Sequence, residues 1–294
     1  MLKTDIKCDF LDLFYHVIKD YKLENQNKLN LFSLEIKNTM FNVDSLADEL
    51  DDHIIPFILS RQQIENMGDK YGGKKSREAR KRFRKYTSNE GELGEVLLYC
   101  FLEAHLKAPK ILSKYELKTS NNDYIKGSDG VHLLKINETT HQLLFGESKL
   151  YGDLKGAIYK AFGSIIEFLE KKQDTFDESL INANLSKEAF KDEDYEMLKT
   201  ILLPKKRVSS NISLDNAFGI FLGFDYNFDG TLKGDEARKK IKEEIEEIVL
   251  ASIDSINNQL KKENLKGYDF YIYTMPINKI EETRKNMIER LVNG

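Results

Sequence analysis

Two short apolar runs of the chain carry charged residues at their ends, where such side chains could act together. Asp129 opens the first run, and Glu147 and Lys149 end the second. If the runs pair as adjacent strands, the three side chains meet at one sheet edge, with Glu147 and Lys149 on one face. Two carboxylates can hold a hard divalent cation, and an ammonium group beside them can orient an attacking water. The spacing predicts a site for phosphodiester hydrolysis with Mg²⁺, or with Mn²⁺ in its place.

Each of these residues also has an ordinary structural interpretation. An aspartate in a Gly-Ser-Asp-Gly turn and a Glu/Lys pair at a strand end are common surface features. Two observations favour the site: Gly146 allows close approach of another backbone, and charged groups at the ends of buried strands are costly without a ligand or compensating partners. Tyr151 lies two residues beyond Lys149, so we expect it on the same face, lining the cleft. His132 is more typical of a sheet-surface residue than of a substrate contact.

A dense basic run precedes this region and is a candidate nucleic-acid contact. It contains Lys81, Arg82, Arg84 and Lys85, with Phe83 and Tyr86 interleaved. Cations and aromatic rings together suit phosphate contact combined with base stacking, although such runs are also common on solvated helix faces and linkers. The net charge of −4 argues against a protein that coats nucleic acid with its whole surface, because nonspecific affinity depends on neutralising phosphates.

The elements that must position these residues follow from the spacing of apolar residues. Predicted strands are 112–118, 130–137, 142–151, 217–224 and 268–277, and predicted helices are 91–106, 154–172, 233–263 and 279–292. This order predicts an α/β fold with a mixed central sheet flanked by helices. Earlier in the chain, Ser45 and Asp48 predict a capping-box start to another helix. Residues 69–90 resemble a boundary or exposed loop, and 173–213 a polar insertion, helical or irregular.

Composition limits the class of protein. A length of 294 residues with 40% apolar and 32% charged residues is typical of a globular chain with one large or two modest domains. No stretch approaches the roughly 20 apolar residues of a membrane span, and the first residues have no signal-peptide pattern, so we expect a cytoplasmic protein. Cys8 and Cys100 fit no zinc or redox spacing and are expected to be reduced, partly buried thiols.

One motif points to a different ligand. The acidic and glycine positions of an EF-hand calcium loop are matched by Asp225, Asn227, Asp229, Gly230 and Glu236. An EF-hand needs a helix before the loop, whereas the preceding run here is typical of a buried strand, and a lysine occupies the ninth position. We interpret the segment as a strand-to-helix turn, with calcium binding as the alternative.

The order of these elements resembles a known superfamily. A helix carrying glutamate, a strand with Asp129, a strand with Glu147-Ser148-Lys149 and a following helix look like the PD-(D/E)xK nuclease core. Ser128 stands where the superfamily usually has proline. Within it, Gly91–Glu95, Gly127–His132 and Gly146–Tyr151 are similar to the HamA family, the nuclease subunits of Hachiman antiphage systems.

The resemblance covers roughly residues 85–290 and implies more than the residues show by themselves. It implies a PD-(D/E)xK nuclease domain over 86–294, after an N-terminal α/β extension over 1–85 that could dock a partner. It also implies an effector that degrades invading or damaged DNA beside a superfamily 2 helicase, HamB, which restrains it.

The resemblance also assigns roles to individual residues. Asp129, Glu147 and Glu95 would bind the metal, Glu95 directly or through a water, and Lys149 would position the nucleophilic water. Glu95 is preferred to Glu92 because it follows the second glycine of the helix start. Its ordinary interpretation is stabilisation of the helix dipole.

Two other functions fit the same residues. A nucleic-acid-binding or adaptor subunit could keep the nuclease fold without activity, although such a module has no need of an intact Asp, Glu and Lys set. A stand-alone restriction endonuclease would need a recognition region, which residues 1–85 could contain. The pattern fits single-stranded or duplex DNA and one or two metal ions.

Overall fold

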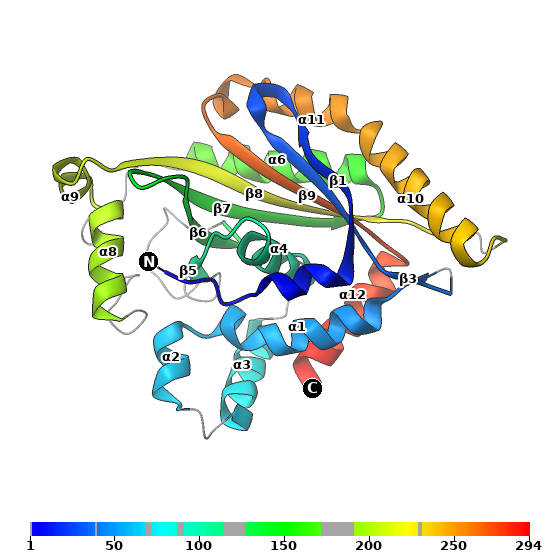
Figure 1. Cartoon of the computed structure of the whole chain (residues 1–294), viewed down its shortest axis with the longest axis horizontal. Coiled ribbons are helices and arrows are strands. Elements are labelled where there is room, and N and C mark those ends of the chain that lie inside the picture. The colour runs from blue at the N-terminus through cyan, green and yellow to red at the C-terminus, as the bar shows by residue number, and fades with distance from the viewer. Residues whose placement is uncertain are drawn as a thin grey trace.

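A seven-stranded mixed sheet forms the centre of the protein (Figure 1). The computed structural model describes residues 2–38, 40–68, 72–86, 91–113, 127–171, 191–228 and 231–294. In sheet order the strands are β1 (Phe14–Lys22), β2 (Lys28–Leu34), β9 (Asp269–Ile277), β8 (Ser213–Asp225), β7 (Thr140–Tyr151), β6 (Gly130–Lys135) and β5 (Lys110–Ser113). A two-stranded sheet pairs β3 (Ile36–Lys37) with β4 (Met40–Phe41). The predicted α/β fold with a mixed sheet is confirmed.

The directions of the strands agree with how far each strand is buried. The four central strands β2, β9, β8 and β7 are parallel, whereas β1 and the β5–β6–β7 edge are antiparallel. Parallel strands are usually covered on both faces, which explains the continuous apolar runs of β7 and β8. Neighbouring residues of β7 contact opposite layers: the Phe145 ring lies 5.0 Å from that of Phe168, while Gly146 faces Leu98.

Helices form both covering layers and a group at one end of the molecule (Figure 1). On one face α4 (Glu92–Ala104) is buried along its whole length, and on the other lies α6 (Leu154–Lys171), whose first turn is capped by Asp153. The other helices in the described part of the chain are α1 (Val43–Ile58), α2 (Arg61–Asn66), α3 (Gly72–Tyr86), α8 (Asp192–Leu202), α9 (Pro204–Ser209), α10 (Gly234–Leu250), α11 (Ile253–Leu260) and α12 (Ile280–Asn293), with 3₁₀ turns η1 (Cys8–Leu13), η2 (Glu24–Gln26) and η4 (Glu263–Leu265).

The N-terminal residues belong to the central sheet. Strand β2 pairs with β9 in parallel over Lys28–Leu31, so a segment near the start of the chain adjoins one near its end. The first 85 residues thus extend the sheet of the later residues, and they add α1, α2 and most of α3.

Several sequence-based predictions need correction. The expected loop at 69–90 contains α3, because Ala79 and Phe83, four residues apart, form an apolar strip that is fully buried. The first turn of α1 is capped by Asn42, which accepts from the Ser45 backbone N–H, and not by Ser45. Of the predicted strand 112–118, β5 covers the start and begins at Lys110, and residues 114–126 lie outside the described ranges.

Two further predicted segments differ from the observed elements. The predicted helix 233–263 is two helices, because α10 packs along β1 and β2 while α11 turns to pack against α6 and η2. In the segment 173–213, α8 and α9 follow residues 172–190, which lie outside the described ranges. Cys100 is fully buried but Cys8 is exposed, and no disulfide joins them.

Candidate functional site

Asp129 and Glu147 occupy neighbouring positions where β6 begins beside β7, at the end away from the turn that joins the two strands. The backbone N–H of Asp129 donates to the Gly146 carbonyl oxygen at 2.9 Å. The Asp129 carboxylate accepts from both the backbone N–H and the hydroxyl of Ser148, each at 2.8 Å. Ser148 stands between Glu147 and Lys149 in the sequence, so these bonds fix the aspartate beside the Glu-x-Lys segment.

Glu147 is a buried carboxyl group with an altered acidity. Its residue is 5% exposed, and its carboxylate contacts the Lys149 ammonium and the Ser164 hydroxyl of α6. Burial, and then the negative charge of Asp129, raise the pKa of Glu147 to about 7, although Lys149 and Ser164 act in the opposite direction. The carboxyl group is therefore poised between its neutral and charged forms near neutral pH.

The donor set fits a divalent cation in its chemistry. Burial and the charge of Asp129 make ionisation of Glu147 unfavourable; a bound cation would relieve this cost, and oxygen ligands suit Mg²⁺. Within the described ranges, however, no group of three His, Cys, Asp or Glu side chains converges as a ready metal cluster. Asp129 and Glu147 are thus a pair that could hold a metal, and no third acidic side chain of the described residues is brought to them both.

Glu95 lies on the other side of the sheet from Glu147. It lines a cavity of about 10 Å³ together with Asp129, His132 and Gly146. Strand alternation turns the Glu147 side chain toward α6, whereas Glu95 projects from α4, so the two glutamates approach Asp129 from opposite faces. Glu92 and Glu95 are both buried, so burial does not distinguish Glu95, the preferred metal ligand, from Glu92.

Two glycines allow α4 to approach the strand so closely. A Cβ atom added to Gly94 would lie 3.1 Å from the Ser148 hydroxyl oxygen, and one added to Gly146 would lie 3.1 Å from a Leu98 methyl carbon. Larger side chains at either position would push the helix away from β7. The Gly-x-x-Gly start of the helix therefore places Glu95 next to Asp129.

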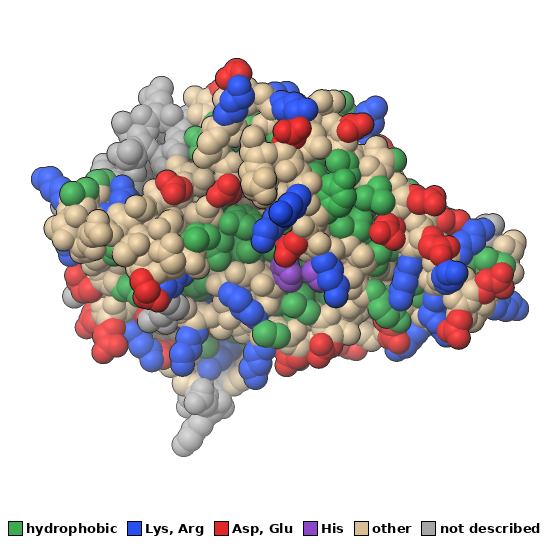
Figure 2. Space-filling model, turned by 45° about the horizontal axis from the view of Figure 1, so that its top comes forward, with side chains coloured by type: hydrophobic (Ala, Val, Ile, Leu, Met, Phe, Trp, Pro, Cys, Tyr) green, Lys and Arg blue, Asp and Glu red, His purple; other side chains and the backbone are tan. Residues whose placement is uncertain are grey.

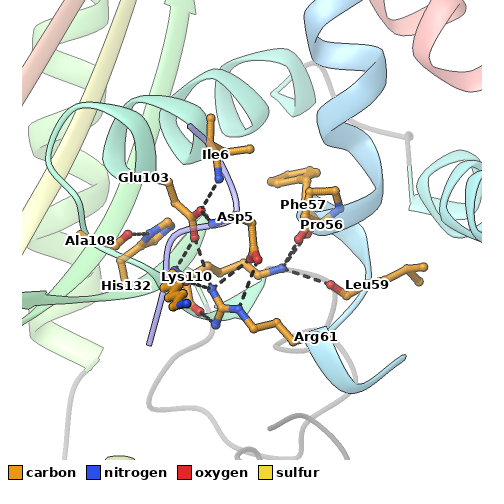
Figure 3. A network of polar contacts seen from close by, with 11 residues as sticks. Asp5, Ile6, Pro56, Phe57, Leu59, Arg61, Glu103, Ala108, Lys110 and His132 are labelled. Carbon is orange, nitrogen blue, oxygen red and sulfur yellow. Dashed lines mark hydrogen bonds and ion pairs between the residues drawn. The ribbon is translucent and has the colours of Figure 1, made fainter. Parts of the chain in front are cut away.

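His132 is a structural residue. It is 2% exposed, and its Nδ1 lies 2.8 Å from the Ala108 carbonyl oxygen (Figure 3). Because a carbonyl only accepts, Nδ1 must carry the proton and donate it. Burial lowers the pKa of His132 to about 3, so the ring stays neutral, and it is neither on the sheet surface nor exposed to substrate.

A polar network that sequence reasoning missed lies beside this cavity (Figure 3). Glu103, fully buried at the end of α4, accepts the backbone N–H groups of Asp5, Ile6 and Lys110. The Lys110 ammonium donates to carbonyl oxygens at the C-terminal end of α1. These bonds tie the N-terminal segment, α1 and β5 to the helix that carries Glu95. The sequence signal for them was Glu103, the one charged residue of α4 beyond its first turn.

Several basic side chains of α3 hold the fold together. Arg80 donates to the Asp51 carboxylate at 2.6 Å and to the Leu291 carbonyl oxygen at 2.6 Å, and Arg84 donates to the Val292 carbonyl oxygen at 3.2 Å. Phe83 is fully buried, so its predicted stacking on a base is wrong. Arg82 pairs with Glu78 on the same helix, Lys81 is exposed, and the side chains of Lys85 and Tyr86 lie outside the described part of the chain.

Comparison with known proteins decides the family. A model of the HamA family matches residues 9–291. The chain belongs to the HamA family. Membership makes it a component of Hachiman antiphage defence, and the match includes the N-terminal strands as well as β6 and β7. Comparison with curated proteins and with solved structures gives no match.

The structure also bears on two other expectations, the EF-hand-like segment and the lack of a membrane span. Strand β8 ends at Asp225 and α10 begins at Gly234, so the EF-hand-like segment joins a strand to a helix, as interpreted from the sequence. Asp225 accepts the backbone N–H of Ile280 at 3.3 Å and so helps to fix the start of α12. Among the described helices, none has the length and apolar character needed to cross a bilayer.

Proposed function

We propose that this member of the HamA family is a Mg²⁺-dependent DNA nuclease, with Mn²⁺ able to replace Mg²⁺. The observation that carries the proposal is the pairing of Asp129 with Glu147, whose pKa is raised to about 7 beside the Lys149 ammonium. Perturbed pKa values cluster at functional sites, and the charged partner of Glu147 is a partly exposed side chain that could also contact a ligand.

Each residue has a role that follows from its surroundings. Asp129 and Glu147 would hold the metal, which when bound supplies Lewis-acid stabilisation of the phosphate and a more acidic water. Ser148 orients Asp129 through two hydrogen bonds. The Lys149 side chain is 27% exposed, so its ammonium can leave Glu147 to position the attacking water or to stabilise negative charge on the phosphate. Glu95 would support Asp129 from the α4 side.

The partner and the setting also belong to this proposal. We propose that the nuclease acts in the cytoplasm beside the superfamily 2 helicase HamB, which restrains it until invading or damaged DNA is present. Family membership supports this arrangement. The N-terminal region supplies candidate docking surfaces because α1, α2 and α3 group at one end of the molecule, away from β7 (Figure 1).

Plasmid cleavage tests the nuclease. Purified wild-type protein, Glu147→Ala and the exposed control Glu243→Ala would be incubated with supercoiled plasmid in Mg²⁺, Mn²⁺ or EDTA, with and without the helicase and ATP. We expect metal-dependent loss of plasmid by the wild type and the control, and none by Glu147→Ala. Discrete fragments would favour a restriction endonuclease, and no cleavage under any condition would leave a binding or adaptor subunit.

A further inference from the structure

The exposed face of α6 borders Ser164, the residue of this helix that contacts the proposed catalytic carboxylate. Ser164 of α6 bonds to Glu147, and Lys160 precedes Ser164 by four residues. Side chains four apart share one helix face, about one turn or 5.4 Å from each other. Lys160 therefore stands roughly one helical turn from the residue that contacts Glu147.

This face is open and combines cations with an aromatic ring. Tyr159 is 51% exposed, and Lys155 and Lys160 are exposed on either side of it. At Gly163, an added Cβ atom would meet nothing within 4 Å, so the helix backbone is accessible there. We call Lys155, Tyr159, Lys160 and Gly163 the α6 ridge.

Strand β7 adds a second exposed ring. Tyr151 is 37% exposed and follows Glu147 by four residues, so strand alternation places it on the α6 side, like Lys149. Two exposed tyrosines thus stand close in the chain to Glu147, one from the strand and one from the helix.

The face drawn in Figure 2 and the helix α3 offer less to a nucleic acid. The face in Figure 2 intersperses Lys and Arg with Asp and Glu, in keeping with the net charge of −4. The arginines of α3 donate within the fold, and α3 lies at the bottom of Figure 1 while α6 lies at the top. The Asp153 carboxylate at the start of α6 accepts the backbone N–H of Gly156, and the exposed acids of α6 itself, Glu167 and Glu170, lie in its last two turns, beyond the α6 ridge.

We propose that the α6 ridge and Tyr151 bind single-stranded DNA and lead it to the carboxylate pair. Bases stack on Tyr151 and Tyr159, and Lys155 and Lys160 contact phosphates. The rings favour a single strand because an unpaired base offers its whole face for stacking, whereas duplex bases are already stacked. The inference rests on the proposed nuclease function and names the form of its substrate.

Binding without cleavage tests this surface. Fluorescence anisotropy in EDTA would compare a labelled oligothymidylate of about 20 nucleotides, long enough for a strand-binding site, with a duplex of the same length. Loss of one stacked base costs about 1–3 kcal/mol, so Tyr159→Ala should weaken single-strand binding about 5- to 150-fold. Tyr159→Phe should bind like the wild type. Lys160→Ala should reduce the salt dependence by about 0.7 in log–log slope, and Lys239→Ala, on α10, should not.

The outcomes separate the two proposals. A Tyr159→Ala affinity within twofold of wild type, equal losses for single strand and duplex, or no binding of either oligonucleotide by the wild type would overturn the strand-binding surface. Metal-dependent cleavage could still occur in each of those cases. Conversely, tyrosine-dependent single-strand binding with no cleavage under any metal would leave this surface in place and remove the nuclease.

Discussion

Glu103 and Glu147 are both buried carboxyl groups with raised pKa values, and they differ in the partners that surround them. For each, burial is the largest cause and the charge of a nearby aspartate the second: Asp5 for Glu103 and Asp129 for Glu147. Glu103 accepts backbone N–H groups on both of its oxygens. The Arg61 guanidinium lies 3.8 Å from Glu103 as an additional partner. Glu147 contacts two side chains, Lys149 and Ser164.

This difference separates a structural carboxylate from a candidate catalytic one. Backbone donors are held in place by the fold, so Glu103 can only keep the chain segments around it together. The Lys149 ammonium is part of a flexible, partly exposed side chain, so it can exchange Glu147 for a substrate or a water. A raised pKa by itself therefore identifies neither role. The role is indicated by whether the groups that contact the carboxylate can move away from it.

The same substitution at the two glutamates should have opposite effects on stability, and the larger effect is at Glu103. Glu103→Gln places an amide NH₂ where an oxygen now accepts a backbone N–H, so donors face each other and one is left unsatisfied. We expect the free energy of unfolding to fall by about 2–3 kcal/mol, measured by urea denaturation at pH 7. Glu167→Gln on the exposed face of α6 is the control. An unchanged midpoint would show that Glu103 does not hold the N-terminal segment to α4.

Glu147→Gln should make the protein more stable at alkaline pH. The pKa of Glu147 is about 7 in the folded state against 4.5 in the unfolded state, so the folded state loses stability as the pH rises from 4.5 through 7. Glutamine carries no charge and avoids this loss, so above pH 7 we expect a gain of about 1–2 kcal/mol, reduced because Lys149 loses its carboxylate.

The gain should disappear near pH 4, where the wild-type carboxyl group is neutral as well. Chemical denaturation of both proteins from pH 4 to pH 8.5 would measure the difference directly. A gain that persists at pH 4, or a loss at pH 8, would mean that burial and the charge of Asp129 do not raise the pKa of Glu147. Cleavage should be lost in this variant at every pH, because the neutral side chain is a poor metal ligand.

How much of the site the sequence could predict depends on the range of the interactions. The pairing of Asp129 with Glu147 follows from two adjacent strands joined by a short turn, so local periodicity was sufficient. Lys149 was found in the same way. Ser164 was not, because only packing of α6 on β7 brings it to Glu147, and nothing in an amphipathic helix indicates which polar residue faces a buried carboxylate.

The fold shows the same division. Strands β6 to β9 and helices α6 and α12 were predicted from apolar runs, whereas the parallel pairing of β2 with β9 joins residues more than 200 positions apart and leaves no local sign. Helix α3 was missed for another reason: its many cations concealed the buried Ala79 and Phe83. The charged composition of α3 reflects its exposed face, whereas burial of Ala79 and Phe83 explains why the segment packs against the fold as a helix.

Gly94 offers the smallest and most local test of the difference between the two glutamates. Gly94→Ala adds a Cβ atom 3.1 Å from the Ser148 hydroxyl oxygen, so α4 or Ser148 must shift by a few tenths of an ångström. Overpacking of this kind costs about 1 kcal/mol of stability. Because Ser148 orients Asp129, cleavage should fall more than stability does, by about tenfold, while the network around Glu103 stays intact.

Gly163→Ala, where the added atom meets nothing within 4 Å, should instead stabilise α6 by up to about 1 kcal/mol. If Gly94→Ala lowered the urea midpoint but left the cleavage rate per folded molecule unchanged, the close approach of α4 would serve packing alone, and the Glu95 side of Asp129 would have no part in the reaction.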